Sequence, residues 1–573
     1  MKLADLKHRM NKGSVVEPED WSQKDIAIIG LSFQLAEGVT ELSQYWNKLK
    51  EGHDFVGELS GIRKQDIYNY LAFLEKKMQL TRVESAFVEE IDKFDYSYFR
   101  LSPKEASLMD PNQRMFLETA WSAIEDAGYG GGKINGSRTG VYLGAGANED
   151  YKRMIERVAP EELGTAFAGN IPSVIASRIS YLLDLRGPSM LIDTACSASL
   201  VALHTACQAI RAGECEAALV GGINMAILPP EHEITVGVES SSGRTHTFDA
   251  ASDGTGRGEG VIAVMIKPLS RAVADRDHIY AVIKGSAVNQ DGSSIGLTAP
   301  NAAAQEDVIV RAWQNAGVEA ESISYMEAHG TGTRLGDPIE IDGMKRAFGR
   351  YTKRKQFCAV GSVKTNMGHL DHAAGLAGLL KVIAALRYKE LPPNVHFKRP
   401  NPEIAFEQSP VYVLDEARAW TTVEGVPRRG GVSAFGLSGT NCHVVVEEAP
   451  KSEESPQSAG PHLLTLSAKG AEGLGVLISR YALALETLSG EDAGAICSTT
   501  NTGRGHYTHR LAIMGADREA LLERLRELSK QGPGAWSGAD VWYGESSVQA
   551  EAERSLREAG IRAEKAARAG EEE

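Results

Sequence analysis

The chain has 573 residues, of which 42% are apolar and 24% are charged, a composition typical of globular proteins with room for a large core and a second domain. Its net charge of −15 disfavours a general nucleic-acid function, because phosphate binding requires a basic surface. Six cysteines without regular spacing argue against a disulfide framework or a zinc ribbon. The sequence has no signal peptide and no apolar run long enough to span a bilayer, so we expect a cytoplasmic protein.

The N-terminal segment, residues 1–24, is rich in charged side chains and precedes the first predicted strand at Ile26. We expect this segment to form a linker or a docking element. The main domain is predicted to occupy residues 25–450 and to end shortly after an apolar strand at 444–446.

The segment around Cys196 joins a short strand directly to a helix. An apolar strand at 190–192 is followed by two polar residues, and a helix is predicted over 198–212. This helix is apolar on nearly all faces, so we expect it at the centre of the domain. A cysteine at a helix N-terminus lies close to free backbone N–H groups and to the positive end of the dipole. We therefore expect a lowered pKa of the Cys196 thiol and a nucleophilic thiolate.

Two histidines lie in comparable surroundings further along the chain. A short strand leads into a loop rich in Gly and Thr, and His329 stands at the start of that loop. A second strand, a polar turn and an apolar helix surround His369, which we expect to open the helix. His372, three residues later, is expected to be a core or surface group without a catalytic role. The repeated order of strand, reactive residue and helix indicates a duplicated β/α unit.

The C-terminal part is predicted to be a separate, smaller domain. Residues 451–462, rich in Ser, Glu, Gly and Pro, are expected to form a linker. Within residues 463–573, strands are predicted at 463–466 and 510–514, each followed by an amphipathic helix. The tail at 549–573 is charged and Ala-rich with no returning segment, so we expect this α/β domain to be incomplete.

Four segments of the main domain resemble the signatures of β-ketoacyl synthase (ketosynthase) domains of polyketide synthases. They are Asp193-Thr-Ala-Cys-Ser-Ala-Ser199, Glu327-Ala-His-Gly-Thr-Gly-Thr333, Lys364-Thr-Asn-Met-Gly-His369 and Gly436-Leu-Ser-Gly-Thr-Asn441. Four motifs in the family's order over about 250 residues make chance agreement negligible. The sequence around 100–106 and 248–256 is most similar to bacterial modular synthases whose acyltransferase acts in trans.

This resemblance implies the thiolase fold, an α/β architecture in which a duplicated unit forms five layers in the order helix, sheet, helix, sheet, helix. A small α/β flanking domain follows in the family. The resemblance also implies a homodimer within a larger megasynthase. It implies no tightly bound cofactor, because the substrates are carried on the 4′-phosphopantetheine of acyl carrier proteins, one loaded with the growing chain and one with malonyl.

The family's reaction, carried over motif by motif, assigns the catalytic roles. Cys196 would accept the acyl chain, which is then extended by decarboxylative Claisen condensation with malonyl-carrier protein. His329 and His369 would donate hydrogen bonds to the enolate oxygen, for which both should be neutral. The backbone N–H groups of Cys196 and Leu437 would form the oxyanion hole.

Further residues receive supporting roles from the same resemblance. Lys364 and Glu340 are expected to pair and hold the loops. Thr331 and Thr333 are expected to bind the pantetheine arm, although a turn at the end of a strand would also explain them. Leu437 and the residue before the nucleophile, Ala195, would border the acyl pocket. The small size of Ala195 predicts tolerance of substituted or branched acyl groups.

Three other interpretations remain open. A non-elongating ketosynthase-like domain only binds or transfers the chain, but such domains typically lack the histidine that is present here as His329. A coenzyme A thiolase or starter-unit synthase would use a second cysteine, for which Cys442 is the candidate, unless it is a packed thiol. Cys196, His329 and His369 could also bind zinc, but a cysteine between a strand and its helix fits a nucleophile better, so we expect no metal.

One further motif has to be weighed. Residues 292–296 match the hydrolase elbow G-x-S-x-G, yet no helix follows Ser294. We therefore expect this segment to be a loop.

Overall fold

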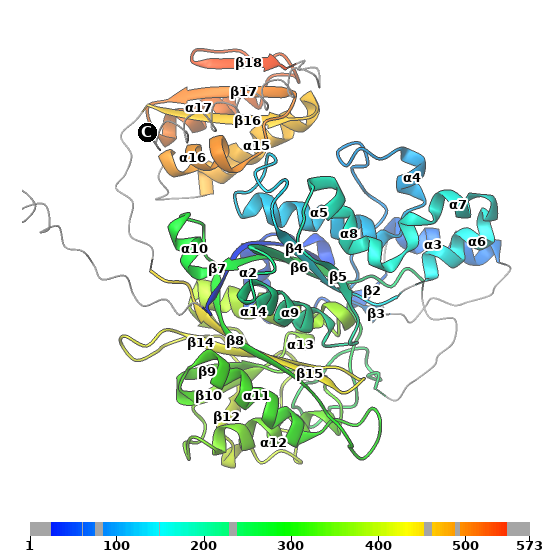
Figure 1. Cartoon of the computed structure of the whole chain (residues 1–573), viewed down its shortest axis with the longest axis vertical. Helices are drawn as coiled ribbons and strands as arrows, with labels where there is room; N and C mark the ends of the chain where they lie inside the picture. The colour runs from blue at the N-terminus through cyan, green and yellow to red at the C-terminus, as the bar shows by residue number, and fades with distance from the viewer. Residues whose placement is uncertain are drawn as a thin grey trace, which may run out of the picture. The chain divides into compact units, whose positions relative to one another are not determined.

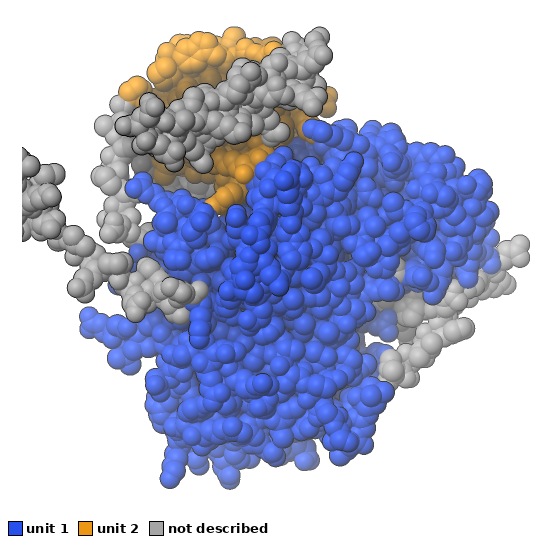
Figure 2. All heavy atoms as spheres, viewed as in Figure 1, with its two compact units in different colours: residues 1–127, 134–451 blue, residues 128–133, 452–573 orange. Residues whose placement is uncertain are grey.

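The computed structural model describes residues 24–59, 61–74, 84–147, 149–228, 238–451, 461–487 and 493–546. They form two compact units, with residues 128–133 and the residues after 451 in the second unit and the remainder in the first (Figure 2). The predicted N-terminal docking segment, except Lys24, most of the linker and the predicted C-terminal tail lie outside the described residues.

The first unit contains two copies of one β-α-β-α-β-α-β-β sequence (Figure 1). The first copy consists of β1 (Ile26–Leu35), α5 (Pro111–Asp126), β4 (Thr139–Gly144), α8 (Pro172–Leu183), β5 (Ser189–Ile192), α9 (Ala198–Arg211), β6 (Ala217–Asn224) and β7 (Gly260–Pro268). The second consists of β8 (Ala281–Gln290), α11 (Ala302–Ala316), β9 (Ile323–Glu327), α12 (Gly336–Gly349), β10 (Cys358–Gly361), α14 (Ala374–Tyr388), β14 (Arg429–Phe435) and β15 (Thr440–Glu448). The duplication expected from the sequence is therefore present.

Further helices and strands are inserted within and between the two copies. The helices are α2 (Leu42–Lys50), α3 (Gly61–Phe73), α4 (Pro103–Ser107), α6 (Asp150–Val158), α7 (Leu163–Ala166), α10 (Leu269–Ala274) and α13 (Lys364–Met367). The strands are β2 (Gly57–Glu58), β3 (Glu84–Ser85), β11 (Glu390–Leu391), β12 (Val411–Val413) and β13 (Arg418–Ala419). None of the described helices combines the length and the apolarity that crossing a bilayer requires.

Both copies have the same strand order. The first runs β5-β4-β6-β7-β1 and the second β10-β9-β14-β15-β8, with β12 added beside β10. In each copy the first three strands of that order are parallel to one another, and the last two pairings are antiparallel. A short pairing of residues 26–28 with 281–283 joins β1 to β8, so the two halves form one continuous sheet in the described part of the chain.

The helices divide this sheet into the expected five layers. α5 and α8 cover one half, α9 and α14 lie between the halves, and α11 and α12 cover the other half (Figure 1). α9 and α14 are buried along most of their length, as predicted for the helix that follows Cys196. This arrangement is the thiolase fold that the sequence motifs imply.

The prediction that His369 opens a helix is wrong. The residue lies in a bend between α13 and α14, which begins only at Ala374 after a short 3-10 turn. Gly368 ends α13 with a φ of +66°, and a Cβ there would lie 2.4 Å from the carbonyl oxygen of Arg257. Only glycine fits this left-handed position without displacing the neighbouring backbone, and the turn directs the next residue away from the helix axis.

The second unit is a small α/β structure. Its elements are β16 (His462–Ala468), α15 (Ala471–Thr487), α16 (Ala493–Gly503), β17 (His509–Gly515), α17 (Arg518–Leu528) and β18 (Val541–Glu545). The two predicted strands and the helices after them are present. The structure adds α16 and a returning strand, β18, which pairs antiparallel with β17. The incompleteness predicted from the tail stays a prediction.

A buried ion pair connects the strand that precedes His329 with the helix that follows His369. Glu327, at the end of β9, and Lys381, in the middle of α14, are each 1% exposed, and Nζ lies 3.1 Å from Oε2. The hydroxyl of Tyr325 donates to the same oxygen at 2.7 Å. The other oxygen, Oε1, accepts the backbone N–H of Val363 at 2.6 Å. One carboxylate therefore joins β9, α14 and the segment that leads into α13.

Removing one partner of this pair should destabilise the first unit strongly. In Lys381→Met the Glu327 carboxylate stays buried without its cation, which typically costs about 3–5 kcal/mol of unfolding free energy. Urea unfolding of the purified chain measures the loss. Lys50→Met, which breaks the exposed pair with Glu390, should cost less than about 1 kcal/mol. Adding Glu327→Gln to Lys381→Met should restore part of the stability, and a loss no larger than that of Lys50→Met would contradict the assignment.

Candidate active site

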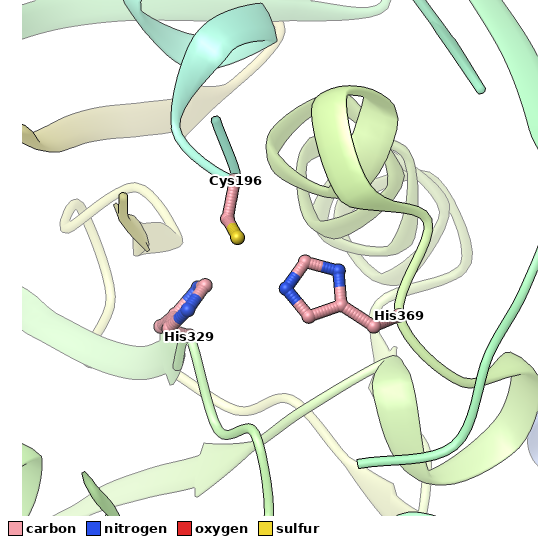
Figure 3. Close-up of side chains that lie close together, drawn as sticks. All are labelled: Cys196, His329 and His369. Atoms are coloured by element: carbon pink, nitrogen blue, oxygen red, sulfur yellow. The ribbon is translucent and has the colours of Figure 1, made fainter. Parts of the chain in front are cut away.

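Three potentially reactive side chains from different segments converge in the first unit (Figure 3). Cys196 follows β5, His329 follows β9, and His369 lies in the bend after α13. One donor atom from each lies within 4.8 Å of the other two. The two imidazole rings are 5.6 Å apart between centroids and nearly perpendicular, and the histidines expose 9% and 6% of their surface. The structure thus brings together the three residues that the sequence singled out.

The backbone before the nucleophile is strained. Ala195 has a φ of +53°, a left-handed conformation that is uncommon for a residue with a side chain. Its N–H donates to Oδ1 of Asp193 at 3.0 Å, and the hydroxyl of Ser197 donates to the carbonyl of Thr194 at 3.0 Å. These bonds hold a sharp turn that presents Cys196 just before the first turn of α9. Strained backbone of this kind clusters at active sites.

His372, for which we expected no catalytic role, is hydrogen-bonded to this turn. Its Nε2 lies 3.2 Å from Oδ1 of Asp193, the oxygen that also accepts the N–H of Ala195. The histidine therefore supports the turn before the nucleophile through Asp193. Among the described residues, no hydrogen bond joins it to Cys196 directly. A carboxylate three residues before the cysteine was the sequence signal for this contact.

The expectation of a lowered thiol pKa is wrong. Burial raises the pKa of Cys196, and the negative charge of Asp371 raises it further. The backbone N–H of Leu437, the charge of Lys364 and the N–H of Cys196 itself act in the opposite direction without overcoming the burial. The sequence pattern revealed the helix end but not the enclosed surroundings or the nearby carboxylate, which favour the protonated thiol.

Both histidines are neutral, as expected. Burial holds the pKa of His329 and of His369 well below the usual value, and the positive charge of Lys364 lowers both further. Nδ1 of His369 accepts the backbone N–H of Asp371 at 2.9 Å, so the ring proton must lie on Nε2. This Nε2 has no hydrogen-bond partner among the described residues and points toward Cys196 and His329 (Figure 3). It is a buried donor available to a ligand.

The loop of His329 is held from two sides. The two carboxylate oxygens of Glu340 accept the N–H groups of His329 and Gly330 at 2.7 and 2.8 Å. Nζ of Lys364 donates to the carbonyl of His329 at 2.6 Å. The expected direct ion pair of Lys364 with Glu340 is not present among the described residues: each side chain binds the loop backbone, and the two act on each other only through their charges.

The remaining predicted residues lie on the loops around the three reactive side chains. Thr331 and Thr333 follow His329 and are half-buried, with their hydroxyl oxygens 3.2 Å apart. The backbone N–H of Leu437 favours the thiolate of Cys196 and so acts to lower the pKa of this thiol, while Leu437 itself is 46% exposed. The N–H of Cys196, the second group proposed for the oxyanion hole, acts on the thiol pKa in the same direction.

Two functional carboxylates were missed in the sequence. The backbone N–H of Asp371 donates to Nδ1 of His369, and its negative charge raises the pKa of Cys196. Asp337 accepts the N–H groups of Phe248 and Gly332, at 2.6 and 3.0 Å, and so fixes the loop that contains the threonines. Both acids stand within or just after the quoted motifs, but their partners come from distant segments or from backbone.

The three side chains fit a metal poorly. Nε2 of His369 could bind a metal only if the ring proton moved to Nδ1. Nδ1 already faces the N–H of Asp371, so two N–H groups would then oppose each other. The geometry favours a hydrogen-bond donor at this position over a zinc ligand.

The charges around Cys196 predict how its reactivity depends on pH. Asp371→Asn removes a negative charge that disfavours the thiolate, so the thiol pKa falls and the pH midpoint of iodoacetamide alkylation should move to lower pH. Lys364→Met removes a positive charge and should move the midpoint the opposite way. Alkylation of Cys196, followed by mass spectrometry of its peptide between pH 6 and 10, measures both. Shifts of the same sign in the two variants would refute this electrostatic assignment.

Known proteins resemble the chain over nearly its full length. The β-ketoacyl synthase N-terminal domain family matches residues 23–272, its C-terminal domain 280–398, and the ketoacyl-synthetase C-terminal extension 400–512. Polyketide synthase PksL of Bacillus subtilis strain 168 is 40% identical over 529 residues, which cover 88% of this chain and 12% of PksL. The chain spans about a tenth of the length of the first curated relatives it matches.

Solved structures of similar size also match. The ketosynthase from module 6 of the bacillaene synthase of Bacillus subtilis 168 is 35% identical, with a TM-score of 0.80 over 93% of this chain and 91% of that one. Ketosynthase twelve of the bacillaene polyketide synthase of Bacillus amyloliquefaciens is 35% identical, with a TM-score of 0.81 over 93% of each chain. With its converging cysteine and histidines, the chain therefore belongs to the β-ketoacyl synthase family, as a ketosynthase domain of the modular polyketide synthase type.

Proposed function

We propose that this chain is an elongating ketosynthase of a polyketide assembly line. It takes an acyl chain from an acyl carrier protein onto Cys196 and extends it by decarboxylative Claisen condensation with malonyl-carrier protein. The observation that carries this proposal is the buried Nε2–H of His369, which has no hydrogen-bond partner in the described part of the chain and faces the thiol beside a second neutral histidine (Figure 3). A site of this kind can stabilise negative charge as it develops on a thioester oxygen.

In the first step, the sulfur of Cys196 attacks the thioester carbonyl of the loaded carrier. The new C–S bond forms, the C–S bond to pantetheine breaks, and the thiol proton ends on the released pantetheine. The N–H groups of Leu437 and Cys196 would hold the oxyanion, since both favour negative charge on the side chain of Cys196. Thr331 and Thr333 would contact the pantetheine arm on its way to the cysteine.

In the second step, malonyl-carrier protein loses CO₂, and the electron pair of the broken C–C bond forms an enolate. His369 and His329 would donate hydrogen bonds to the enolate oxygen, and both are uncharged donors because burial lowers their pKa. The enolate carbon then attacks the acyl-Cys196 carbonyl. A C–C bond forms, the C–S bond breaks, and Cys196 leaves as a thiolate that regains a proton.

The structure disfavours the thiolase alternative. Cys442 is fully buried in β15, its sulfur contacts the carbonyl oxygen of Leu200 at 3.4 Å, and burial raises its pKa. A thiol in this position cannot serve as the second acid–base group of a thiolase. The presence of His329 disfavours the non-elongating alternative, because such domains typically lack this histidine. Hydrogen bonds from Glu340 and Lys364 hold its loop in place.

Other parts of the proposal rest on family resemblance. We propose that the chain works in a megasynthase whose acyltransferase acts in trans, as a homodimer, and with both an upstream acyl carrier and a malonyl-loaded carrier. We retain the expected cytoplasmic location as part of the proposal.

The nucleophile and the histidines can be separated experimentally. His329→Ala should slow condensation about 100- to 1000-fold, the usual effect of losing one preorganised donor, while self-acylation stays largely intact. Cys196→Ala should abolish acylation in a protein that remains folded. Intact-protein mass spectrometry measures acylation, and mass spectrometry of the carrier-bound β-ketoacyl product measures condensation.

A matched cysteine control is available in the second unit. Cys497→Ala removes a buried thiol of α16 and should acylate as the unaltered chain does. Acylation of Cys196→Ala, or condensation by His329→Ala at an unaltered rate, would exclude the proposed chemistry.

The size of Ala195 predicts acyl selectivity. Ala195→Met adds heavy atoms to the wall beside the nucleophile, and such overpacking typically costs about 1–3 kcal/mol, or roughly 5- to 150-fold in acylation by an α-branched thioester. A short linear thioester should lose much less. Ala195→Gly, which suits the left-handed backbone, is the control and should accept both substrates. Equal losses for the linear and branched thioesters in Ala195→Met would show that this side chain does not border the acyl pocket.

A further inference from the structure

The most exposed large apolar side chains in the described part of the chain lie next to each other. Leu297 is 91% exposed and Ile295 is 88% exposed, both in the loop that follows β8. This is the loop at 292–296 whose sequence matches the hydrolase elbow, and as predicted it leads to no nucleophile helix. Contiguous exposed aliphatic side chains are uncommon on a protein surface unless another molecule covers them.

The sheet topology brings this loop to the edge that carries the active site. The end of β8 pairs with the start of β15, Gln290 opposite Thr440, and β15 follows directly on the end of β14. β14 in turn runs parallel to β9, so the loops after β9 and β14 leave the sheet at the same edge as the loop after β8. Those two loops carry His329 and Leu437.

Hydrogen bonds fix the base of the apolar loop to the loop of Leu437. The N–H of Asp291 donates to the carbonyl of Gly439 at 2.9 Å, and the side chain of Asn441 donates to Oδ1 of Asp291 at 2.7 Å. Nε2 of Gln290 donates to the carbonyl of Ser438 at 3.1 Å. The base of the loop with the two exposed side chains is thus bonded to the segment that contains Leu437, whose backbone N–H acts to lower the pKa of the Cys196 thiol.

Two more exposed aliphatic residues stand at this edge. Leu437 is 46% exposed, and Leu335, in the loop after His329, is 53% exposed. Together with Ile295 and Leu297 they make up what we call the mouth patch. Arg334, exposed beside Leu335, adds a positive charge.

We propose that the mouth patch is the docking surface for the acyl carrier protein that delivers the thioester to Cys196. This inference rests on the proposed function. If, as proposed, the pantetheine arm passes Thr331 and Thr333 on its way to Cys196, its carrier docks on the loops that surround them. The arm begins with an anionic phosphodiester, which suits Arg334. A second copy of the chain fits less well, because a lasting contact here would close the entrance to the thiol.

The test compares a carrier-bound with a carrier-free acyl donor. The double variant Ile295→Ser/Leu297→Ser is supplied with butyryl-N-acetylcysteamine and, separately, with an acyl carrier protein whose phosphopantetheine bears a butyryl group. Acylation of Cys196 is followed by mass spectrometry. We expect kcat/KM for the carrier-bound donor to fall about tenfold, the usual scale for losing buried aliphatic anchors from an interface, and the value for the carrier-free donor to stay unchanged.

A control variant lies at the opposite end of β14. Val423 is 77% exposed in the loop before this strand, whose 7 residues separate its two ends by roughly 20 Å. Val423→Ser should leave both rates unchanged. Light scattering of the double variant checks whether the patch instead holds two copies of the chain together.

Each other outcome overturns the proposal. Unchanged carrier-bound acylation in the double variant, an equal loss with both donors, or a change in oligomeric state would each exclude carrier docking at this patch. Acylation of the unaltered chain by butyryl-N-acetylcysteamine but not by the carrier would exclude it as well, while the nucleophile assignment would stand. No acylation of Cys196 by either donor would refute the proposed function itself.

Discussion

Two buried carboxylates determine the geometry of the site by binding backbone. Glu340 accepts the N–H groups of His329 and Gly330, and Glu327 accepts the N–H of Val363 while pairing with Lys381 in the central helix. A buried carboxylate without such partners would be very unfavourable, so both loops are held in the single arrangement that satisfies it. The positions of His329 and of the segment leading to His369 depend on this requirement.

Burial of the site also sets the protonation states of its reactive groups. It favours the neutral form of the histidines, which are good hydrogen-bond donors, and the protonated form of the thiol, which is a poor nucleophile. Burial keeps the histidines neutral, which makes them hydrogen-bond donors that carry no charge of their own. It also favours the protonated form of Cys196, so thiolate formation is opposed by burial and by Asp371 and assisted by backbone N–H groups and Lys364. A site enclosed enough to stabilise an enolate through fixed dipoles therefore also disfavours the thiolate of its own nucleophile.

Buried reactive groups and exposed aliphatic side chains lie on loops at the same side of the duplicated sheet. The loops after β8, β9 and β14 begin with residues that support the reactive groups and continue into exposed aliphatic side chains. The loops after β8 and β14 are joined by hydrogen bonds at their bases. A molecule bound to the exposed residues would therefore contact loops that also hold His329 and Leu437, whose backbone N–H acts on the pKa of Cys196. If the mouth patch receives the carrier as proposed, the same few loops carry both substrate delivery and the reactive groups.

From the amino-acid sequence we could predict the local order of strand, reactive residue and helix, the three reactive side chains and, through the family resemblance of the motifs, the five-layer fold. These features depend on residues that are close together in the chain, such as the strand before Cys196 and the apolar helix after it. Only the tertiary structure decided that the Cys196 thiol has a raised pKa, that Lys364 and Glu340 bind the loop between them, and that β18 returns beside β17. Each of these depends on burial or on partners from distant segments, because electrostatic and hydrogen-bond energies are set by neighbours in space and not by neighbours in the chain.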